Sequence, residues 1–374
     1  MKTLTTALLG CFCFAQMAKA DVPFKFSLRS RALLDASLSK YNKEDLQGFY
    51  RLEDFRIGFK ATYQQYELKA DIGLTNKKVA IKDFLFNYHF KNSFLSLGNA
   101  YEPFGMDMLI STVDLRFHQS AVSSQAFCEG RKLGLTYNVN LPKLYAATGL
   151  YADRDVNDLG KEGGRNNITS TSRLVLRDHH EDHLLHVGTA FSYRSKPVNT
   201  ADSYLETREG EGVTSLFNQS LLHAEIPGLQ QEMKGVVELL FTGKRWLFQT
   251  EYFYNRIHFE NEKAQGVYNP LGVYAQASFL AIGQGFAYDA ANALAGRPTS
   301  DRALELTARF DYNQMNRKGI MGGEEKDFSI GANFYFNKYL SVKLNGSYVW
   351  TDSHCNPYFK KDMFLVQTRL QYAF

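Results

Sequence analysis

Apolar and polar side chains alternate along many segments of this chain. Residues 364–374 place Phe, Val, Leu and Tyr side chains, together with Thr368, on one face, and Gln367, Arg369 and Gln371 on the other. Successive side chains of a β-strand point to opposite sides, so this pattern predicts a strand with one apolar and one polar surface.

The same period of two recurs from one end of the chain to the other. It is clear in residues 55–64, 66–74, 304–312 and 340–348, and no linker rich in Pro or Gly separates these segments. We count about 17 candidate strands, but an up-and-down barrel with both ends on one side needs an even number. The alternation is poor in 195–215, so one candidate strand in this region is false or missing. The sequence predicts about 16 strands, with 18 possible.

The polar faces of these strands carry many charged side chains, which indicates where they point. A soluble barrel buries an apolar interior, whereas a membrane barrel turns its apolar face to lipid and its polar face to water. Aromatic residues make up 14% of the chain, which suits the aromatic girdles of membrane barrels. We therefore predict an all-β fold, a transmembrane antiparallel β-barrel in the bacterial outer membrane. Its last strand is expected to pair with its first and close the wall.

The first residues have the pattern of an export signal. Lys2 gives a basic start, residues 4–14 are largely apolar, and Ala-Lys-Ala at 18–20 fits a cleavage site. The apolar run is shorter than the ~20 residues that a membrane helix needs. We expect a signal peptide at 1–20 and a single outer-membrane β-barrel domain at 21–374.

The cysteines leave two questions open. Leu-Leu-Gly-Cys at 8–11 resembles a lipoprotein cleavage site, but the apolar core before Cys11 is very short, which favours ordinary cleavage. Cys128 and Cys355 remain in the exported chain, and an oxidising periplasm permits a bridge between them. Nothing in the sequence brings them together, so two separate thiols are the simpler expectation. The formal net charge of +4 does not indicate a nucleic-acid partner.

Bases outnumber acids on the faces predicted to line the lumen. The inward bases are Lys25, Arg29, Arg31, Arg56, Lys60, Lys69, Lys132, Arg173, Arg177, Arg194, Arg309, Lys343 and Arg369. The inward acids are Asp35, Glu67, Asp71, Asp83, Glu251, Glu305 and Asp311. A low-dielectric wall focuses such a field into the lumen and favours anions. The alternative is a lumen in which these charges pair across strands.

The connection at 102–129 is long for a barrel loop and apolar for a segment in water. It contains Phe104, Met106, Leu109, Ile110 and Phe117 but few charges. We expect it to fold back into the lumen, pack on the inner wall and form a constriction. An ordinary surface loop or a clasp between subunits is the alternative interpretation.

Several passages resemble one family of outer-membrane proteins. They are LGNAYEPFG (97–105) with STVDLRF (111–117), GVYAQASF (272–279) with ALELTARF (303–310), and IGANFY (330–335) with RLQYAF (369–374). In this order and spacing they resemble the phosphate-selective porin O and P family. The resemblance covers most of the chain after residue 94.

The resemblance implies a 16-stranded, trimeric channel whose lumen is lined by arginines and lysines that pass phosphate or polyphosphate. Two departures concern selectivity. The family tends to have an acid–arginine pair after the loop phenylalanine, where this chain has His118-Gln119. It tends to have Thr-Gly-Glu after the paired strand, where this chain has Ile282-Gly283-Gln284. Fold and channel activity are therefore implied more strongly than the ion that passes.

We expect a porin for passive diffusion of small solutes, in particular anions such as phosphate or polyphosphate, and no cofactor. Expected partners are these solutes, membrane lipid, lipopolysaccharide and further copies of the chain in a homotrimer. The candidate anion contacts are Arg116, Arg131, Lys132, Arg56, Lys60 and Arg309. A guanidinium can hold a phosphate or carboxylate through two hydrogen bonds, whereas an ammonium acts as a point charge.

Two other functions are considered. The polar segment 177–183, with His186 beyond it, offers histidines and carboxylates that could bind a transition metal. It lies in a predicted turn, where polar residues usually meet water, so no metal site is expected. A barrel lipase or protease, or a plugged structural or adhesive barrel, is the rival to a porin. The sequence has no Gly-x-Ser-x-Gly motif, and 16 or more strands suit transport better than catalysis at the rim.

Overall fold

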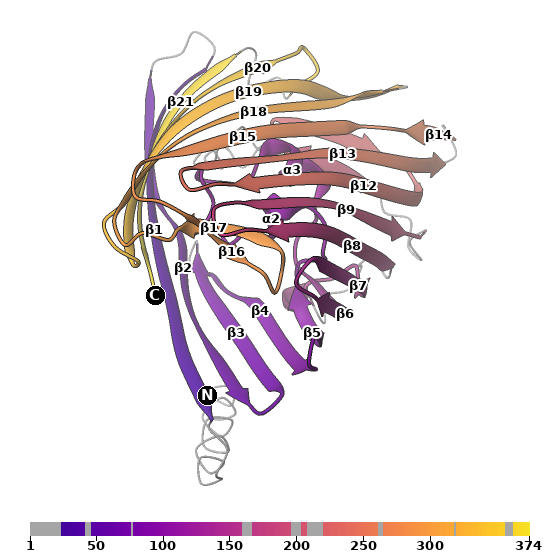
Figure 1. Ribbon diagram of the computed structural model, residues 1–374. Helices are drawn as coiled ribbons and strands as arrows, with labels where there is room; N and C mark the ends of the chain where they lie inside the picture. The colour runs from indigo at the N-terminus through magenta and orange to yellow at the C-terminus, as the bar shows by residue number, and fades with distance from the viewer. Residues whose placement is uncertain are drawn as a thin grey trace.

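A computed structural model describes residues 24–41, 46–75, 78–158, 167–195, 203–207, 220–260, 265–317, 319–355 and 362–374. The wall consists of β1 (Lys25–Tyr41), β2 (Gln47–Tyr63), β3 (Tyr66–Thr75), β4 (Lys78–His89), β5 (Ser93–Ala100), β6 (Lys132–Asn140), β7 (Leu144–Ala152), β8 (Ile168–His179), β9 (Leu184–Arg194), β12 (Leu229–Thr242), β13 (Trp246–Glu260), β14 (Gln265–Tyr268), β15 (Leu271–Ile282), β18 (Ala303–Arg317), β19 (Ile320–Tyr335), β20 (Leu340–Thr351) and β21 (Met363–Ala373). These strands form one closed antiparallel ring (Figure 1). The predicted signal peptide at 1–20 lies outside the described residues.

The last strand pairs with the first and closes the ring, as predicted from the sequence. β1 pairs with β2 on one side and with β21 on the other, from Arg31 opposite Ala373 to Tyr41 opposite Met363. β14 and β15 both pair with β13 and are separated only at 269–270, so they form one wall strand interrupted at Pro270. The barrel therefore has 16 strands, and the possible count of 18 is excluded.

The region where the strand count was ambiguous contains strands that do not belong to the wall. β10 (Ser203–Thr207) and β11 (Leu222–Ile226) pair only with each other, as a separate two-stranded sheet between β9 and β12. Leu222, Ala224 and Ile226 are buried, and β11 lies against β19. Their alternation is genuine, but it belongs to a hairpin in a connection.

The predicted strand faces are confirmed by burial. On β18, Leu306 and Phe310 are each 45% exposed on the outer surface, whereas Glu305 and Arg309 are buried on the inner one. Apolar side chains on the outside of an isolated chain are unfavourable in water, at roughly 25 cal/mol per Å² of apolar area. The same surface is favourable against lipid, because hydrocarbon replaces water there.

Two ends of the barrel differ in their connections. At the turn end, short connections join most strands, as between β2 and β3 at 64–65. At the loop end, the connections include 101–131, 153–167 and 195–228. Outer-membrane barrels place short turns in the periplasm and long loops outside the cell. The described residues contain no helix that is long and apolar enough to cross a membrane.

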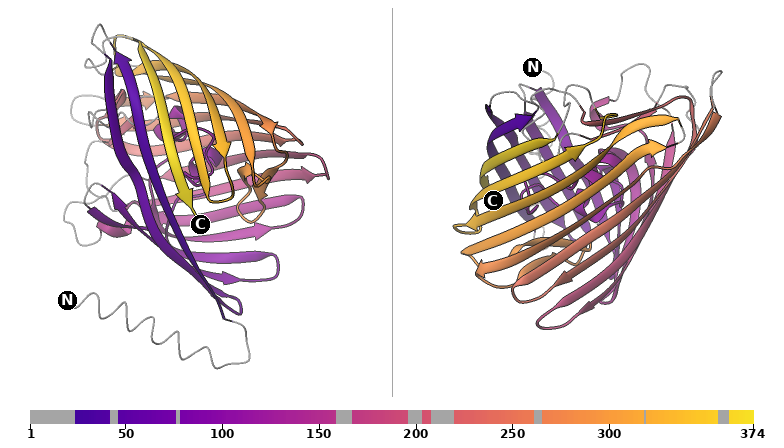
Figure 2. Two further views of the ribbon diagram at one scale, coloured as in Figure 1. Left: turned by 90° about the vertical axis from the view of Figure 1, so that its left-hand side faces the viewer. Right: turned by 90° about the horizontal axis from the view of Figure 1, so that it is seen from above.

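Two further segments fold into the lumen. From the loop end, residues 101–131 enter the ring with α2 (Met106–Leu109) and α3 (Val122–Phe127), which confirms the predicted constriction loop. From the turn end, residues 283–302 enter as the hairpin of β16 (Phe286–Asp289) and β17 (Leu294–Pro298). Both segments lie within the ring of strands (Figures 1 and 2). The apolar core of the protein lies between these segments and the wall.

Phe253 is the main apolar anchor of the constriction loop. It is fully buried on the inner face of β13, stacks on Phe127 of α3 with 5.7 Å between ring centroids, and lies 6.3 Å from Phe104. Cys128 is buried in the same cluster. Cys128 and Cys355 are both buried thiols without a bridge in the structure, as the simpler expectation had it.

Candidate functional site

Wall carboxylates hold the constriction loop by its helix N-termini. Glu251 on β13 accepts the amide of Asp107 at 2.9 Å, at the start of α2. Asp311 on β18 accepts the amides of Val122 and Ser123 at 2.6 and 3.1 Å, at the start of α3. The first amides of a helix lack partners within it, and a negative charge there is favoured by the helix dipole. Two of the predicted lumen acids therefore position the loop.

Wall bases hold the same loop by its carbonyl groups. Arg369 on β21 forms a two-fold ion pair with Asp35 on β1, with both N–O distances at 2.7 Å, and donates to the carbonyl of His118 at 2.7 Å. Lys343 on β20 donates to the carbonyl of Leu115. Burial and the charges of Arg369 and Lys343 keep the pKa of His118 well below its usual range, so this imidazole is neutral. Arg369 and Lys343 therefore hold the loop in place.

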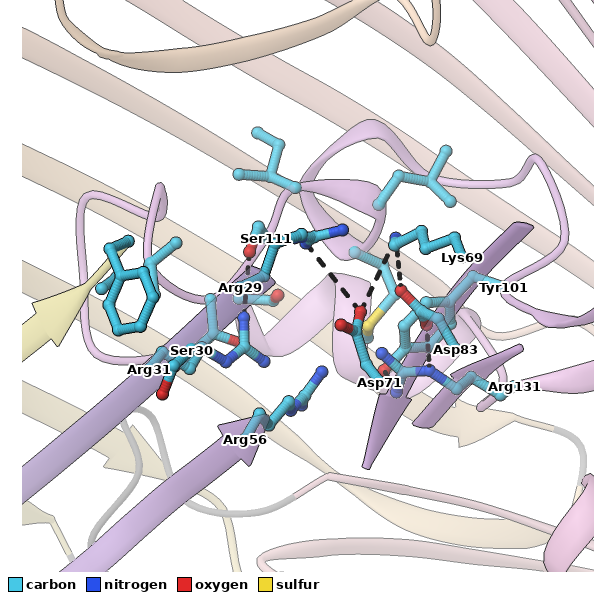
Figure 3. Close-up of a pocket in the computed structure, with 18 residues that line it drawn as sticks. Arg29, Ser30, Arg31, Arg56, Lys69, Asp71, Asp83, Tyr101, Ser111 and Arg131 are labelled. Carbon is cyan, nitrogen blue, oxygen red and sulfur yellow. Dashed lines mark hydrogen bonds and ion pairs between the residues drawn. The ribbon is translucent and has the colours of Figure 1, made fainter. Parts of the chain in front are cut away.

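Two cavities lie on the other side of the loop. A cavity of about 250 Å³ separates residues 108–113 of the loop from β1 to β4 and the end of β21 (Figure 3). It is lined by Arg29, Arg31, Arg56, Lys69, Arg131, Asp71 and Asp83, together with Tyr101 and Ser111. A cavity of about 710 Å³ adjoins it and shares Arg29, Lys69 and Asp83.

The charges around the smaller cavity are only partly balanced. Asp54 pairs with Arg31 at 2.6 Å and with Arg56 at 2.9 Å. Asp83 likewise pairs with Lys69 and Arg131, both at 2.7 Å. Each carboxylate thus pairs with two bases, which leaves a surplus of positive charge around the cavity.

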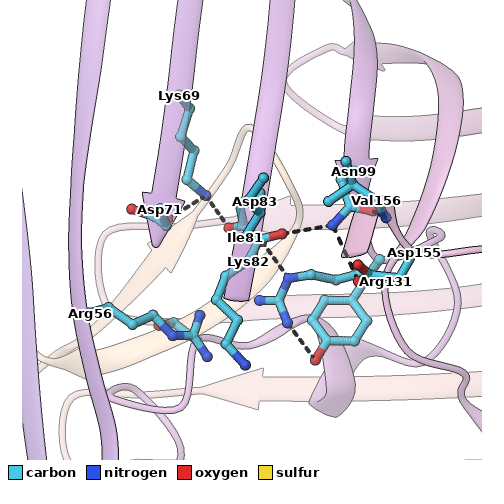
Figure 4. A network of polar contacts seen from close by, with 12 residues as sticks. Arg56, Lys69, Asp71, Ile81, Lys82, Asp83, Asn99, Arg131, Asp155 and Val156 are labelled. Atoms are coloured by element: carbon cyan, nitrogen blue, oxygen red, sulfur yellow. Dashed lines mark hydrogen bonds and ion pairs between the residues drawn. The ribbon is translucent and has the colours of Figure 1, made fainter. Parts of the chain in front are cut away.

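Lys82 adds to this surplus, although the sequence alternation does not predict that it faces inward. Its ammonium lies between Arg56 and Arg131 (Figure 4), and it forms no ion pair within the part of the chain that the structure describes. The β3–β4 register shifts between Ala70 and Ile72, so Lys82 and Asp83 together stand opposite Asp71. This β-bulge breaks the alternation.

Gly73 opens the space that the Lys82 side chain occupies. A Cβ at Gly73 would lie 2.6 Å from Cε of Lys82, so any larger residue would displace the lysine stem. The sequence signal for this arrangement was the pair Lys82-Asp83 opposite Asp71-Ile72-Gly73 on the neighbouring strand. Strict alternation instead assigns Lys82 to the lipid face.

The structure divides the predicted anion contacts into two groups. Arg56 and Arg131 line the smaller cavity, and Lys60 lines the larger one, where it pairs with Glu67 at 2.7 Å. Their contact with anions stays a prediction.

The other predicted contacts, Arg116, Lys132 and Arg309, are buried away from both cavities. Arg116 lies 3.5 Å from Glu305 and donates to the carbonyl of Gly296. Lys132 pairs with Glu129 at 2.6 Å. The guanidinium of Arg309 donates to the carbonyl of Gln119 at 3.2 Å. This geometry favours a role in holding the loop, because a group without access to water cannot meet a passing ion.

The histidine-rich segment forms the turn between β8 and β9. His180 pairs with Asp178 at 2.9 Å and stacks on His183 with 4.6 Å between ring centroids. Among the described residues, no group of three or more His, Cys, Asp or Glu side chains is arranged to hold a metal. His186 points inward and bonds Glu238 at 2.9 Å.

Comparisons with known proteins agree with this architecture. The structure superposes on an anion-selective porin from Comamonas acidovorans with a TM-score of 0.60 and 10% sequence identity. The match covers 94% of this chain and 100% of that porin. It also superposes on the outer membrane channel DcaP of Acinetobacter baumannii, with a TM-score of 0.60 and 9% sequence identity. This match covers 94% of this chain and 97% of that channel. These likenesses show the fold.

A relative in sequence and a family match complete the comparison. An uncharacterised protein of Caulobacter vibrioides is 24% identical over 275 residues, which are 70% of this chain and 54% of that protein. The chain thus spans about half the length of this relative. Residues 24–374 match the model of the family described as phosphate-selective porin O and P. The family and the barrel fold place the protein in the bacterial outer membrane, and the chain belongs to the phosphate-selective porin O and P family.

Proposed function

We propose that this protein is an outer-membrane channel for passive diffusion of small solutes, and that it prefers anions such as phosphate. The observation that carries the preference is the positive surplus around the smaller cavity. The cavity is lined by Arg29, Arg31, Arg56, Lys69 and Arg131 with Asp71 and Asp83. Lys82 lies beside Arg56 and Arg131, and Asp54 pairs with Arg31 and Arg56. A channel wall of low dielectric focuses the field of these charges into the passage.

The arrangement suits passage better than tight binding. Asp54 and Asp83 each draw two bases into ion pairs, which lowers the attraction that any one base exerts on an anion. A conducting pore must bind its ion weakly enough to release it, so several partly neutralised bases in series meet this requirement. Guanidinium groups at Arg31, Arg56 and Arg131 match the paired oxygens of a phosphate or carboxylate.

A homotrimer is part of the proposal. It is supported by membership of a porin family and by the fold shared with OmpT of Vibrio cholerae, whose structure was determined in a trimer form (9% identity, TM-score 0.58). Chemical cross-linking of the purified protein in detergent tests it. A ladder that ends at a single barrel would contradict the trimer.

The direct test of selectivity is the reversal potential of single channels in a salt gradient. We expect anion preference at low salt that weakens as the ionic strength rises, because the screening length falls from about 10 Å at 0.1 M to about 3 Å at 1 M. Cation preference at low salt would refute the anion channel and leave the porin fold in place.

A barrel plugged by its own loops is the second candidate, because two segments from opposite ends occupy the lumen. Stable open steps in planar bilayers support the channel, whereas a correctly folded barrel without conductance supports the plug. The same preparation tests for catalysis. Absence of conductance together with hydrolysis of lipid or peptide would favour a barrel enzyme over a channel.

A further inference from the structure

The two cavities beside the constriction loop differ in charge. Arg31, Arg56 and Arg131 line only the smaller cavity, where bases are in surplus. The charged side chains that line only the larger cavity show no such surplus: they are Lys60, Lys91, Glu67, Asp114 and Asp289, with His89 beside them. The cavities adjoin and share Tyr101 and Ser111, so one solute can meet both environments.

The part of the wall that β5 and β6 give to the larger cavity is neutral and forms hydrogen bonds. β5 contains no charged residue, and β6 contains none after Lys132. Asn87 of β4 stands in register with Ser96 and Thr136, and the three side chains line the cavity as a row. Amides and hydroxyls both donate and accept hydrogen bonds, so this row can replace water around the hydroxyls of a solute.

These wall groups hold one another and keep capacity for a solute. Ser96 Oγ donates to Oδ1 of Asn87 at 2.6 Å, and the hydroxyl of Tyr145 donates to Oδ1 of Asn138 at 3.1 Å. The amide nitrogen of Asn138 has no hydrogen-bond partner among the residues that the structure describes, although Asn138 is only 5% exposed and lines the larger cavity. A nearly buried donor of this kind is costly unless a molecule in the cavity accepts its hydrogen bond.

The constriction loop gives the same cavity an apolar side. Pro103, Leu109 and Ile110 line it from the loop. Ligand cavities commonly combine apolar side chains with a few polar groups that fix orientation. A sugar or another polyol presents both kinds of surface, because its C–H groups are apolar and its hydroxyls form hydrogen bonds. The larger cavity, with a volume of about 710 Å³, therefore suits a hydroxylated body better than a second phosphate.

We propose that the preferred solutes are anionic polyols, which carry one phosphate or carboxylate group and several hydroxyls, as sugar phosphates and sugar acids do. The anionic group contacts Arg56 and Arg131 in the smaller cavity. The hydroxylated body lies in the larger one, against Asn87, Thr136 and Asn138. Several weak contacts in series allow release of the solute. This inference rests on the anion channel proposed above, because the anionic group needs the surplus of bases.

The first experiment compares how three solutes block the chloride current of single channels. Inorganic phosphate, glucose 6-phosphate and glucose are added at a pH where both phosphates are dianions. We expect glucose 6-phosphate to halve the current at a concentration roughly tenfold lower than inorganic phosphate, because its body adds hydrogen bonds, and glucose to block less than either. Equal half-blocking concentrations of the two phosphates, in a channel whose reversal potential still shows anion preference, would overturn this proposal and leave the anion channel standing. Block by glucose as strong as that by glucose 6-phosphate would also overturn it.

The second experiment separates recognition of the body from its size. Its readout is the ratio of the half-blocking concentrations of inorganic phosphate and glucose 6-phosphate. Asn138→Leu keeps the bulk of the side chain but removes the amide, and should lower this ratio roughly threefold or more. Arg56→Gln is the control: it should weaken block by both solutes and leave the ratio as it is, because both carry the anionic group. Thr136→Val, of nearly the same shape as the original, repeats the test if Asn138→Leu does not fold. Heat-modified electrophoretic mobility checks the fold of each variant. An unchanged ratio in a folded variant would mean that size alone causes the stronger block.

A third measurement distinguishes passage from block. Uptake of labelled glucose 6-phosphate into proteoliposomes at low salt should exceed uptake of labelled glucose roughly threefold or more, because the surplus of bases raises the concentration of the anion in the channel. Equal or slower uptake of glucose 6-phosphate would show that the cavities hold this solute without passing it, and would refute its place among the preferred solutes.

Discussion

The two halves of the lumen carry similar charges but use them in opposite ways. In the packed half, formed by β13 to β21, the inward side chains of Glu251, Asp311 and Arg369 are buried and bind the constriction loop. In the open half, formed by β1 to β6, Arg56 and Arg131 line the smaller cavity. We therefore expect an inward-facing base to contact anions only where no segment covers it.

The cause of this difference is the loop itself. Residues 101–131 have an apolar surface that packs on Phe253, together with backbone groups that need partners away from water. Buried amides and carbonyls are costly without hydrogen bonds, so wall charges on the packed half satisfy them. In the open half, Lys132 also contacts the loop, but most inward charges line the two cavities, so we expect them to be available to solutes.

The largest effect is expected from Arg369→Ala in the packed half. This change leaves Asp35 as a buried carboxylate without its base and removes the donor to the His118 carbonyl. Breaking a buried pair by removing one partner typically costs about 3–5 kcal/mol. Thermal unfolding of the detergent-solubilised barrel measures it. Lys60→Ala, at a partly exposed pair in the open half, is the control and should cost about 1 kcal/mol or less.

The next effect concerns the carboxylate that caps α3. Asp311→Asn keeps the size of the side chain but replaces a charged acceptor of two amides by a neutral one. We expect a loss of about 1–3 kcal/mol and greater current noise, because the loop is held less firmly. Unfolding curves and single-channel recordings provide the two measurements. An unchanged stability would show that the wall does not hold the loop through Asp311.

Cysteine accessibility tests the boundary between the two halves. Ser111 lines the smaller cavity, whereas Ser124 on α3 is fully buried against the packed half. In a background without Cys128 and Cys355, Ser111→Cys should react with a bulky thiol reagent and lose roughly half of its conductance or more. Ser124→Cys should remain unlabelled in the folded barrel. Fast labelling of Ser124→Cys would mean that the loop does not stay on the wall.

The smallest effect is a shift in ion preference. Lys82→Gln should lower the anion-to-cation permeability ratio by roughly a factor of two at low salt, because one unit of surplus charge leaves the passage. Lys343→Gln removes the same charge from the packed half and should change the ratio less. The reversal potential measures both, on channels with matched expression and folding. Equal shifts would mean that every lumen base acts through the summed field, covered or not.

Alternation in the sequence was enough to determine the barrel. On β18, one face carries Leu306 and Phe310 and the other carries Glu305 and Arg309. With lipid outside the barrel and water inside, the strand is stable only when its apolar face points outward. Pairing of β1 with β21 follows, because an open edge cannot remain in lipid. The inward fold of the loop at 101–131 was also predictable, since its apolar residues need a surface to cover.

The tertiary structure decided which of the inward charges meet solutes. Arg116 and Arg309 look like lumen bases in sequence, but long-range packing of the loop and the hairpin buries them. Lys82 was assigned to lipid by strict alternation, and only the bulge opposite Asp71 turns it inward. Strand faces follow from neighbours along the chain, whereas access to water depends on segments that are distant in sequence. Local patterns therefore determine the wall, and the contents of the lumen require the folded chain.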